Sequence, residues 1–259
     1  MRVVRAEEDL VVTALVGIPF GSNHLHSMLL DERAHTGQVD EQPGRRLLTI
    51  RAADSEGHRG SAHILVNRMY AGRGYSTTPV DERRRPGRIT LIGTDRDITR
   101  GTITIGFDGS DHLLADGCFP DVLEQLRREA TVLCEFVKLA IDGVGRSRRV
   151  LASLFHTAFI YAHQIKGCDR ILIEVNPRHV RFYEVTLGFA SLTRERLNRR
   201  VNAPAVLMSL ELAFAEQQIL RVQAGNAWKM RSGRSLYSYC FSREEAAGIA
   251  ARLRAINQA

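Results

Sequence analysis

Residues 131–189 form the stretch that most restricts how this chain can fold. A strand-like run at 131–141 leads through a Gly/Arg loop into an amphipathic helix at about 149–166. An apolar strand at 171–175 follows, and a short helix then begins at Asn176-Pro177 and ends at Gly188. Two strands joined by a helix lie parallel through a right-handed crossover. The stretch therefore predicts an α/β fold.

The ends of the two helices carry their own signals. Asn176 can cap the free N–H groups of the second helix, and Pro177 fits its first turn, where no hydrogen bond is lost. Gly167 stands where a left-handed residue would end the first helix, and Gly188 ends the second. Both helices begin just past the carboxyl end of a strand. Open α/β sheets bind ligands at that edge.

The rest of the chain adds strands and helices on both sides of this unit. Two strand-like runs at 89–93 and 98–107 are joined by four polar residues, which is the pattern of a hairpin, so the sheet should be mixed. The other predicted elements are strands at 47–53, 190–197 and 205–212, and helices at 61–71, 121–130, 213–223 and from Ser242 onward. We expect an N-terminal extension at 1–46 that adds little to the core, a central domain at 47–213 and a helical extension at 214–259.

Composition narrows the class of protein without naming a function. The 259 residues are 44% hydrophobic and 25% charged, which is ordinary for a globular protein that buries a sizeable core. No apolar run approaches the roughly 20 residues that span a bilayer. The four cysteines are scattered, which favours a reduced compartment, so we expect a cytoplasmic protein. The net charge of +7 suits an acidic partner such as nucleic acid, or only a solvated basic surface.

Several phrases of this sequence resemble the GNAT superfamily of N-acyltransferases. They are E-F-V-K-L-A-I at 135–141, G-V-G-R-S-R-R at 143–149 and N-x-x-x-x-x-F-Y-E-x-x-L-G-F at 176–189. Together with L-V-N-R-M-Y-A-G-R-G-Y at 65–75 and G-T-I-T-I-G-F-D at 101–108, they are most similar to the long-chain N-acyl amino acid synthases of the FeeM type. These enzymes are related to the acyl-homoserine-lactone synthases, and the resemblance spans 47–213.

The resemblance implies a GNAT-like acyl-CoA N-acyltransferase fold, a mixed twisted sheet flanked by helices. It implies transfer of a long acyl chain to the amine of an amino acid by direct attack. The implied donor is an acyl-phosphopantetheine carried on acyl carrier protein, with no tightly bound cofactor. An acidic carrier protein would account for the basic surface without nucleic acid.

Two residues are candidates for proton transfer during amide formation, which needs a base for the amine and an acid for the leaving thiolate. Strict alternation would place Glu135 on one strand face with Val137, Leu139 and Ile141, where an apolar setting raises a carboxyl pKa. Glu135 can equally be a structural residue paired with Lys138 or an arginine. The resemblance implies that Glu135 is the base and Tyr183 the acid, although Tyr183 can instead be a packed ring.

The start of the long helix is the candidate donor site. Helix N–H groups, the helix dipole and arginines together hold a phosphate, although the same residues can form a solvated basic cap. Arg148 and Arg149 stand where the acyl-CoA loop R/Q-x-x-G-x-G/A has glycines, which favours a donor with one phosphate. The predicted donor-binding residues are Leu139, Ala140, Ile141, Gly143, Gly145, Arg146, Arg148, Arg149 and Asn176.

Two arginines are candidates for the acceptor site, because the resemblance implies that Arg68 and Arg73 bind the carboxylate of the amino acid. We predict no metal, since His156 and His163 lie about two helical turns apart and cannot act as an i, i+4 pair. Two other functions stay open. One is an acetyl-CoA-dependent acetyltransferase of the same fold, and the other is a non-catalytic acyl- or nucleic-acid-binding module.

Overall fold

The computed structural model describes residues 11–16, 46–53, 55–75, 87–95, 97–129, 131–142, 148–224 and 234–257. Its centre is a nine-stranded mixed sheet in the order β1-β2-β3-β4-β5-β6-β9-β7, with β8 paired to β9. Among the strands that the structure describes, only β5 and β6 pair in parallel. The strands are β1 (Val11–Val16), β2 (Arg46–Ala52), β3 (Arg88–Asp95), β4 (Ile98–Phe107), β5 (Leu133–Ile141), β6 (Arg170–Val175), β7 (Ala190–Ser191), β8 (Arg196–Asn198) and β9 (Ala203–Glu211).

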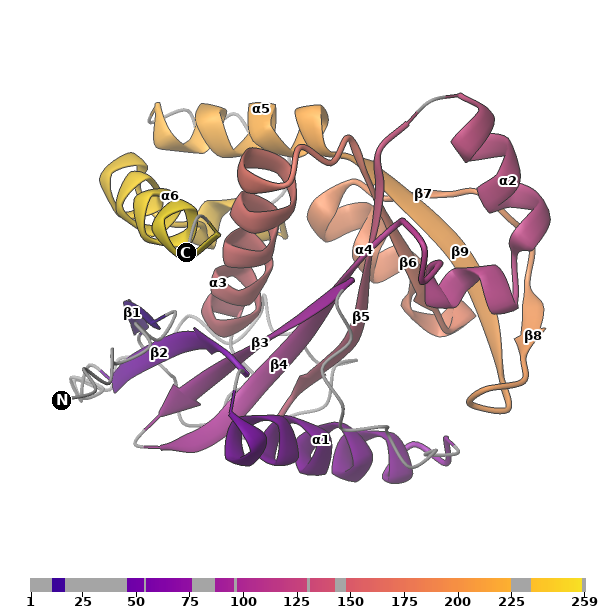
Figure 1. Cartoon of the computed structure of the whole chain (residues 1–259), viewed down its shortest axis with the longest axis horizontal. Coiled ribbons are helices and arrows are strands. Elements are labelled where there is room, and N and C mark those ends of the chain that lie inside the picture. The colour runs from indigo at the N-terminus through magenta and orange to yellow at the C-terminus, as the bar shows by residue number, and fades with distance from the viewer. Residues whose placement is uncertain are drawn as a thin grey trace, which may run out of the picture.

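Helices cover both faces of this sheet. Helix α1 lies along one face of β4 and β5, and α3 lies on the other face with α5 and α6 beside it (Figure 1). The helices are α1 (Glu56–Ala71), α2 (Pro120–Arg128), α3 (Arg148–Phe159), α4 (Val180–Leu187), α5 (Leu212–Gln223) and α6 (Arg243–Asn257). Shorter 3-10 helices are η3 (Leu114–Gly117), η5 (Pro177–His179) and η7 (Leu236–Tyr239). Within the described residues, none of the helices combines the length and apolarity needed to cross a membrane.

The central strand–helix–strand–helix unit is confirmed. The predicted helix at 149–166 is α3 followed by a π-helical segment, η4 (Ile160–Ile165), and Gly167 ends it with φ +68°. Asn176 accepts the N–H of Arg178 at 3.3 Å and so caps η5. Gly188 ends α4 in the left-handed conformation with φ +81°. These ends follow from local chemistry, because short polar side chains cap helices and glycine tolerates positive φ.

Other predictions need correction. The predicted strand at 190–197 is two short strands, β7 and β8, because the side chain of Thr193 between them accepts the backbone N–H of Leu207 in place of a ladder bond. In α1 the buried face consists of Ala62, Leu65 and Val66, whereas Ile64 is 68% exposed.

The main hydrophobic core lies between the sheet and α3, and it runs on into the C-terminal helices. Leu154 of α3, Ile103 of β4, Ile219 of α5 and Leu253 of α6 belong to one cluster of buried side chains. At the other end of the chain, β1 pairs with β2 along its whole length and extends the sheet. The proposed domain boundaries at 46 and 213 remain predictions, and strand pairing or core packing crosses each of them.

His156 joins α3 to the C-terminal segment. Its side chain is 1% exposed, and its Nδ1 accepts the backbone N–H of Phe241 at 3.1 Å. The imidazole also stacks on the Phe241 ring, with centroids 5.2 Å apart. Burial lowers the pKa of His156 to about 4. The docked C-terminal segment therefore requires a neutral imidazole.

We expect acid to weaken the fold through His156. The unfolded chain would bind a proton at a pKa of about 6.5, whereas the folded chain binds it only near the lowered value, so the stabilisation is present above about pH 6.5 and is lost as pH falls toward 4. Between about pH 7.5 and 5, His156 should account for a loss of about 2 kcal/mol in the free energy of unfolding. Urea denaturation of the wild type and His156→Gln would measure it, because Gln can accept the same N–H without titrating. Equal pH dependence of the two proteins would contradict this role.

Candidate active site

The sheet parts between its two parallel strands. β5 and β6 pair at Leu133↔Arg170, Cys134↔Ile171 and Glu135↔Leu172, and the described parts of these strands make no pair beyond that point. Both strands continue, β5 to Ile141 and β6 to Val175, and they diverge in Figure 1. The carboxyl ends of two parallel strands thus separate in the middle of the sheet, which is where ligands bind in open α/β folds.

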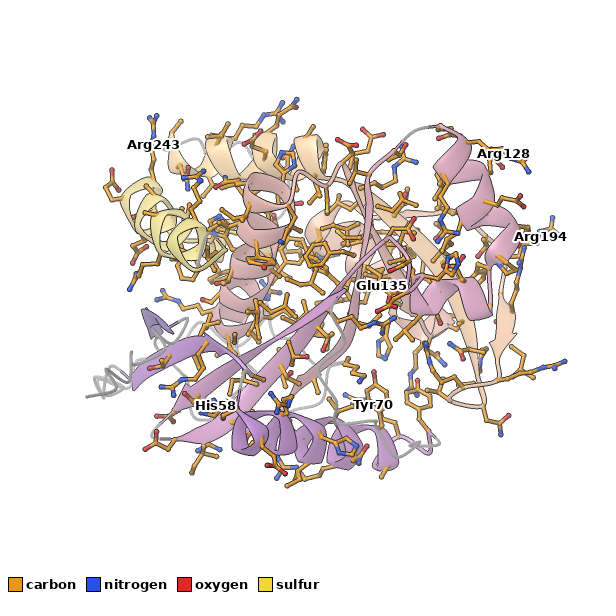
Figure 2. All side chains as sticks on the ribbon, viewed as in Figure 1. His58, Tyr70, Arg128, Glu135, Arg194 and Arg243 are labelled. Atoms are coloured by element: carbon orange, nitrogen blue, oxygen red, sulfur yellow. The ribbon has the colours of Figure 1, made fainter. Side chains whose placement is uncertain are left out.

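Two glutamates lie on the α1 face of the sheet at this parting. Glu135 is the last residue of β5 that pairs with β6, and its partner is Leu172. Side chains alternate along a strand, so Glu174 lies on the same face as Leu172 and Glu135. Figure 2 shows Glu135 within the sheet and Tyr70 at the C-terminal end of α1.

Tyr70 lies in the last turn of α1, and Arg73 follows the end of that helix. Burial raises the pKa of Tyr70, the nearby charges of Arg200 and Arg73 oppose that rise, and Glu174 adds to it. Arg200 belongs to the turn between β8 and β9, and its Nη2 lies 3.3 Å from the Glu174 Oε2. Residues distant in sequence therefore share one electrostatic environment.

Tyr183 approaches the same place from the opposite face of the sheet. It belongs to α4, and its ring contacts those of Phe182 and Phe189 at centroid distances of 5.2 and 5.8 Å. Burial raises the pKa of Tyr183, Tyr70 adds to the rise, and Arg73 opposes it. The strand parting thus allows groups on both faces to interact. We call Tyr70, Arg73, Glu135, Glu174, Tyr183 and Arg200 the β5–β6 cluster.

Glu135 is held tightly within this cluster. Its side chain is 1% exposed, Oε1 accepts the N–H of Leu114 at 2.8 Å, and Oε2 accepts the N–H of Ala115 at 3.2 Å. Arg88 lies 3.4 Å from Oε1. Burial raises the pKa of Glu135 above its ordinary value, although the two N–H groups and Arg88 oppose the rise. Glu135 therefore combines a structural role at η3 with the raised proton affinity that a base requires.

The prediction that Glu135 shares one strand face with Val137, Leu139 and Ile141 was partly wrong, because only Val137 lies on that face. Thr104 pairs with Val137 and Thr102 with Ala140, so β5 contains one extra residue there. This β-bulge coincides with a positive φ of +52° at Lys138. Because of it, Ala140 takes the face of Glu135 in place of Leu139. Ile141 pairs with Gly101 and shares the opposite face, toward α3.

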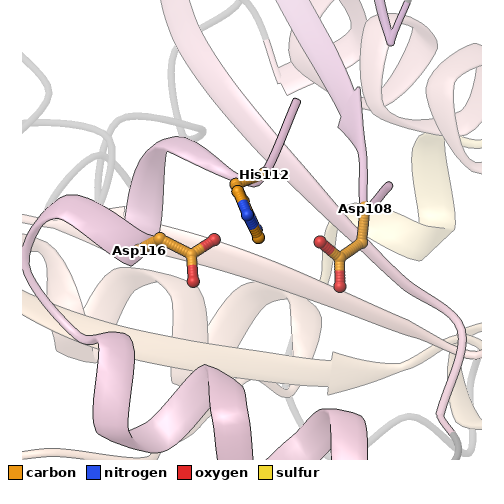
Figure 3. Close-up of side chains that lie close together, drawn as sticks. All are labelled: Asp108, His112 and Asp116. Carbon is orange, nitrogen blue, oxygen red and sulfur yellow. The ribbon is translucent and has the colours of Figure 1, made fainter. Parts of the chain in front are cut away.

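A second group of titratable residues lies in and just before η3, and Figure 3 shows its members, Asp108, His112 and Asp116. Their possible ligand atoms lie within 4.8 Å of one another. Arg127 already binds both carboxylates, with 2.7 Å contacts to each, and its charge helps to lower the pKa of Asp116. Asp116 in turn accepts the N–H of Leu113 at 2.9 Å. The group reads as an ion-pair network that fixes η3 and thereby orients Glu135.

Comparison with known proteins agrees with this geometry. The family model described as "N-acyl amino acid synthase FeeM" matches residues 61–211, more than half of the chain. This chain belongs to the FeeM family of N-acyl amino acid synthases. It is therefore an acyltransferase, as the resemblance implied.

Solved structures place this FeeM-family member among proteins of known architecture. FeeM itself, an N-acyl amino acid synthase from uncultured soil microbes, is 28% identical with a TM-score of 0.62, over 69% of this chain and 99% of FeeM. The AHL synthase LasI is 14% identical with a TM-score of 0.49, over 64% and 91% of the two chains. A GNAT-family acetyltransferase from Streptococcus pneumoniae is 15% identical with a TM-score of 0.46, over 63% of this chain and 98% of the acetyltransferase. No curated protein matches the sequence significantly. The predicted GNAT-like fold is confirmed.

The predicted donor residues of this FeeM-family chain fall into three groups. Gly143, Gly145 and Arg146 lie outside the described residues. Arg148 and Arg149 open α3, where Arg148 is half-buried and Arg149 exposed. Leu139, Ala140 and Ile141 form the end of β5, which is not paired with β6. Asn176 caps η5, and its amide group donates to the Pro204 carbonyl at 3.4 Å. Their roles in donor binding stay predictions.

The acceptor arginines separate in the structure. Arg73 follows α1, donates to the Met69 carbonyl at 3.0 Å and lies near Tyr70 and Tyr183. Arg68 is exposed, one turn from the exposed Ile64 on the outer side of α1. The structure brings only Arg73 into the β5–β6 cluster.

Sequence reasoning missed four residues around this cluster, which are Tyr70, Arg88, Glu174 and Arg200. Glu174 alone had a usable signal, because a single charge interrupts the apolar run at 171–175. The others come from separate elements, and only the fold brings them together.

We expect Gly106 to be required for the position of Glu135. A Cβ at Gly106 would lie 2.8 Å from both Cγ and Oε1 of Glu135, which cannot yield because backbone groups hold its carboxylate. Gly106→Ala should lower the free energy of unfolding by about 1–3 kcal/mol, as overpacked sites do. Gly109→Ala is the matched control, since a Cβ there meets no described atom within 4 Å. Chemical denaturation compares the two, and equal stability would contradict the close approach.

Proposed function

We propose that this enzyme transfers a long acyl chain from the phosphopantetheine arm of acyl carrier protein to the amine of an amino acid. The observation that supports it best is the β5–β6 cluster, in which a buried carboxylate of raised pKa and a partly buried tyrosine come from opposite faces of one sheet. An amide-forming site needs a group that takes a proton and another that supplies one.

In the proposed reaction the amine attacks the thioester carbonyl directly. The new N–C bond forms and the C–S bond breaks, with no covalent enzyme intermediate. Glu135 accepts the proton that the amine loses, and Tyr183 donates its phenolic proton to the departing thiolate. The two protonated states are then restored by exchange with solvent.

The donor is proposed to lie along the end of β5, on the side where β5 is not paired with β6. Beyond Glu135, the backbone of residues 136–141 is not bonded to β6, so its polar groups can bind the amides of pantetheine. Leu139, Ala140 and Ile141 belong to this segment, and Asn176 stands across the parting at the end of β6. Gly143, Gly145, Arg146, Arg148 and Arg149 would hold the single phosphate.

A carrier-protein donor is supported by charge. The chain carries a net charge of +7, and exposed arginines lie beyond the end of β6 and on the β8–β9 turn. Arg178 and Arg181 follow β6, and Arg199 and Arg200 form part of the turn. A basic surface beside the donor path steers an acidic partner to it.

The acceptor is proposed to bind beside α1. Arg73 is assigned to the carboxylate of the amino acid, because its charge acts on both Tyr70 and Tyr183, whereas Arg68 is exposed. Tyr75 links the end of α1 to η5, since its hydroxyl accepts an N–H of Arg178 Nη2 at 2.9 Å.

We expect a purified sample to form N-acyl amino acids from palmitoyl carrier protein and a mixture of amino acids, detected by mass spectrometry. Palmitoyl-CoA should be a poorer donor and acetyl-CoA should give no product. High salt should raise the KM for the carrier protein, because screening weakens a steered encounter. Equal turnover with acetyl-CoA would instead favour an acetyltransferase. DNA binding without acyl transfer from any donor would favour a non-catalytic module.

Glu135→Gln tests the proposed base. We expect kcat to fall by about 10²- to 10⁴-fold, the usual contribution of a general base. The wild-type rate should rise with pH through a pKa above the ordinary glutamate value, because burial raises that of Glu135. Glu211→Gln is the control, since Glu211 is 67% exposed at the other end of the β6–β9 pair. Thermal unfolding of both variants separates lost chemistry from lost folding, and full activity of a folded Glu135→Gln would remove it as the base.

A further inference from the structure

Glu174 is the most unusual buried group outside the assignments made above. It interrupts the apolar strand β6, and its side chain is 6% exposed. Asn198 Nδ2 and Arg200 Nη2 both donate to Oε2. The other oxygen, Oε1, is buried and has no hydrogen-bond partner among the residues that the structure describes.

An unpaired buried carboxylate oxygen is costly. Leaving such an acceptor unsatisfied costs on average more than a normal hydrogen bond contributes, and native proteins rarely tolerate it without a bound partner. The two donors on Oε2 fix the carboxylate in place, so Oε1 cannot simply rotate toward them. A hydrogen-bond donor from outside the described residues would satisfy this oxygen.

The surroundings of Glu174 define the chemistry of that donor. The cluster contains two carboxylates, and Arg88 and Arg200 lie on Glu135 and Glu174 respectively. Burial raises the pKa of Glu174, Arg200 opposes the rise, and the charge of Glu135 adds to it. A small cation with several N–H donors would relieve the repulsion between the two carboxylates and satisfy Oε1 at the same time.

We propose that Glu174 Oε1 receives a hydrogen bond from the nitrogen of the acceptor amino acid and so positions it for attack. This inference rests on the proposed function and adds to it a second acidic residue in contact with substrate. The acceptor arrives as an ammonium and loses one proton to solvent, which gives the neutral amine that attacks. The amine donates one N–H to Glu174, and the second proton, which the nitrogen loses as the amide forms, passes to Glu135. Glu174 itself keeps its charge through the reaction.

Each oxygen of Glu135 already accepts one backbone N–H of η3 and keeps one lone pair, which can take the proton, whereas Oε1 of Glu174 accepts no bond from the described residues. Glu174 has the free acceptor atom and Glu135 the anchored one. The two carboxylates have separate roles, because Glu174 orients the nitrogen and Glu135 takes its proton. Arg73 would hold the opposite charge of the same amino acid, so the site selects a molecule that carries an ammonium and a carboxylate together.

Glu174→Gln tests the proposal, because it keeps the shape and an oxygen for Asn198 and Arg200 but replaces the free acceptor with an NH₂ group. With saturating palmitoyl carrier protein, KM for the preferred amino acid should rise about ten- to hundredfold, which is the loss of one charge-assisted hydrogen bond. The inhibition constant of its desamino analogue, which lacks the nitrogen, should change by less than about twofold on the same reasoning. Glu211→Gln should change neither value.

Calorimetric titration with the standard amino acids gives a readout that does not need turnover. The wild type should bind at least one of them, and Glu174→Gln should bind it about tenfold or more weakly. Weaker binding in the variant, with no N-acyl product from the wild type, would support Glu174 while overturning the proposed function.

Equal losses for the amino acid and its desamino analogue would overturn the role of Glu174. So would unchanged KM and binding in a folded variant of altered stability, which would show that Oε1 holds an internal water only. A fall in kcat with KM unchanged would also overturn it, because Glu174 would then act in the chemical step and not in holding the acceptor.

Discussion

The separation of β5 from β6 after Glu135↔Leu172 is the constraint on which the rest of this molecule depends. A continuous sheet would keep α1 and α4 apart, because they lie on opposite faces. Where the two strands diverge, Tyr70 and Arg73 from one face come within electrostatic reach of Tyr183 from the other. The same divergence leaves backbone polar groups of β5 without a strand partner. One irregularity in pairing thus creates both the meeting point of the side chains and the path for a donor.

Placing two carboxylates at that point is unfavourable unless other groups compensate for it. The fold supplies Arg88 from β3 and Arg200 from the β8–β9 turn, and it supplies backbone N–H groups from η3. The η3 helix is in turn fixed by Asp116 and Arg127. Both carboxylate oxygens of Glu135 accept hydrogen bonds from described residues, whereas Oε1 of Glu174 accepts none. This difference gives the two carboxylates different chemistry.

Much of this fold could be predicted from the sequence, because its signals are local. Helix caps at Asn176 and Ser242, left-handed ends at Gly167 and Gly188, and the 89–107 hairpin all depend on residues within a few positions. The β-bulge at Lys138 could not be predicted, because a lysine with positive φ does not change the pattern of apolar and polar residues along the strand. The partners of Glu174, Asn198 and Arg200, lie 24 and 26 residues further along the chain. The sequence therefore could not predict that both donate to the same carboxylate oxygen.

A crystal structure of the enzyme with an N-acyl amino acid product tests the account most directly. The account predicts the amide of the product at the parting of β5 and β6, with its nitrogen beside Glu135 and Glu174 and its carbonyl carbon within reach of Tyr183. The acyl tail and the amino acid would extend from that point on opposite sides. A product bound elsewhere, with the β5–β6 cluster unchanged and untouched, would contradict it.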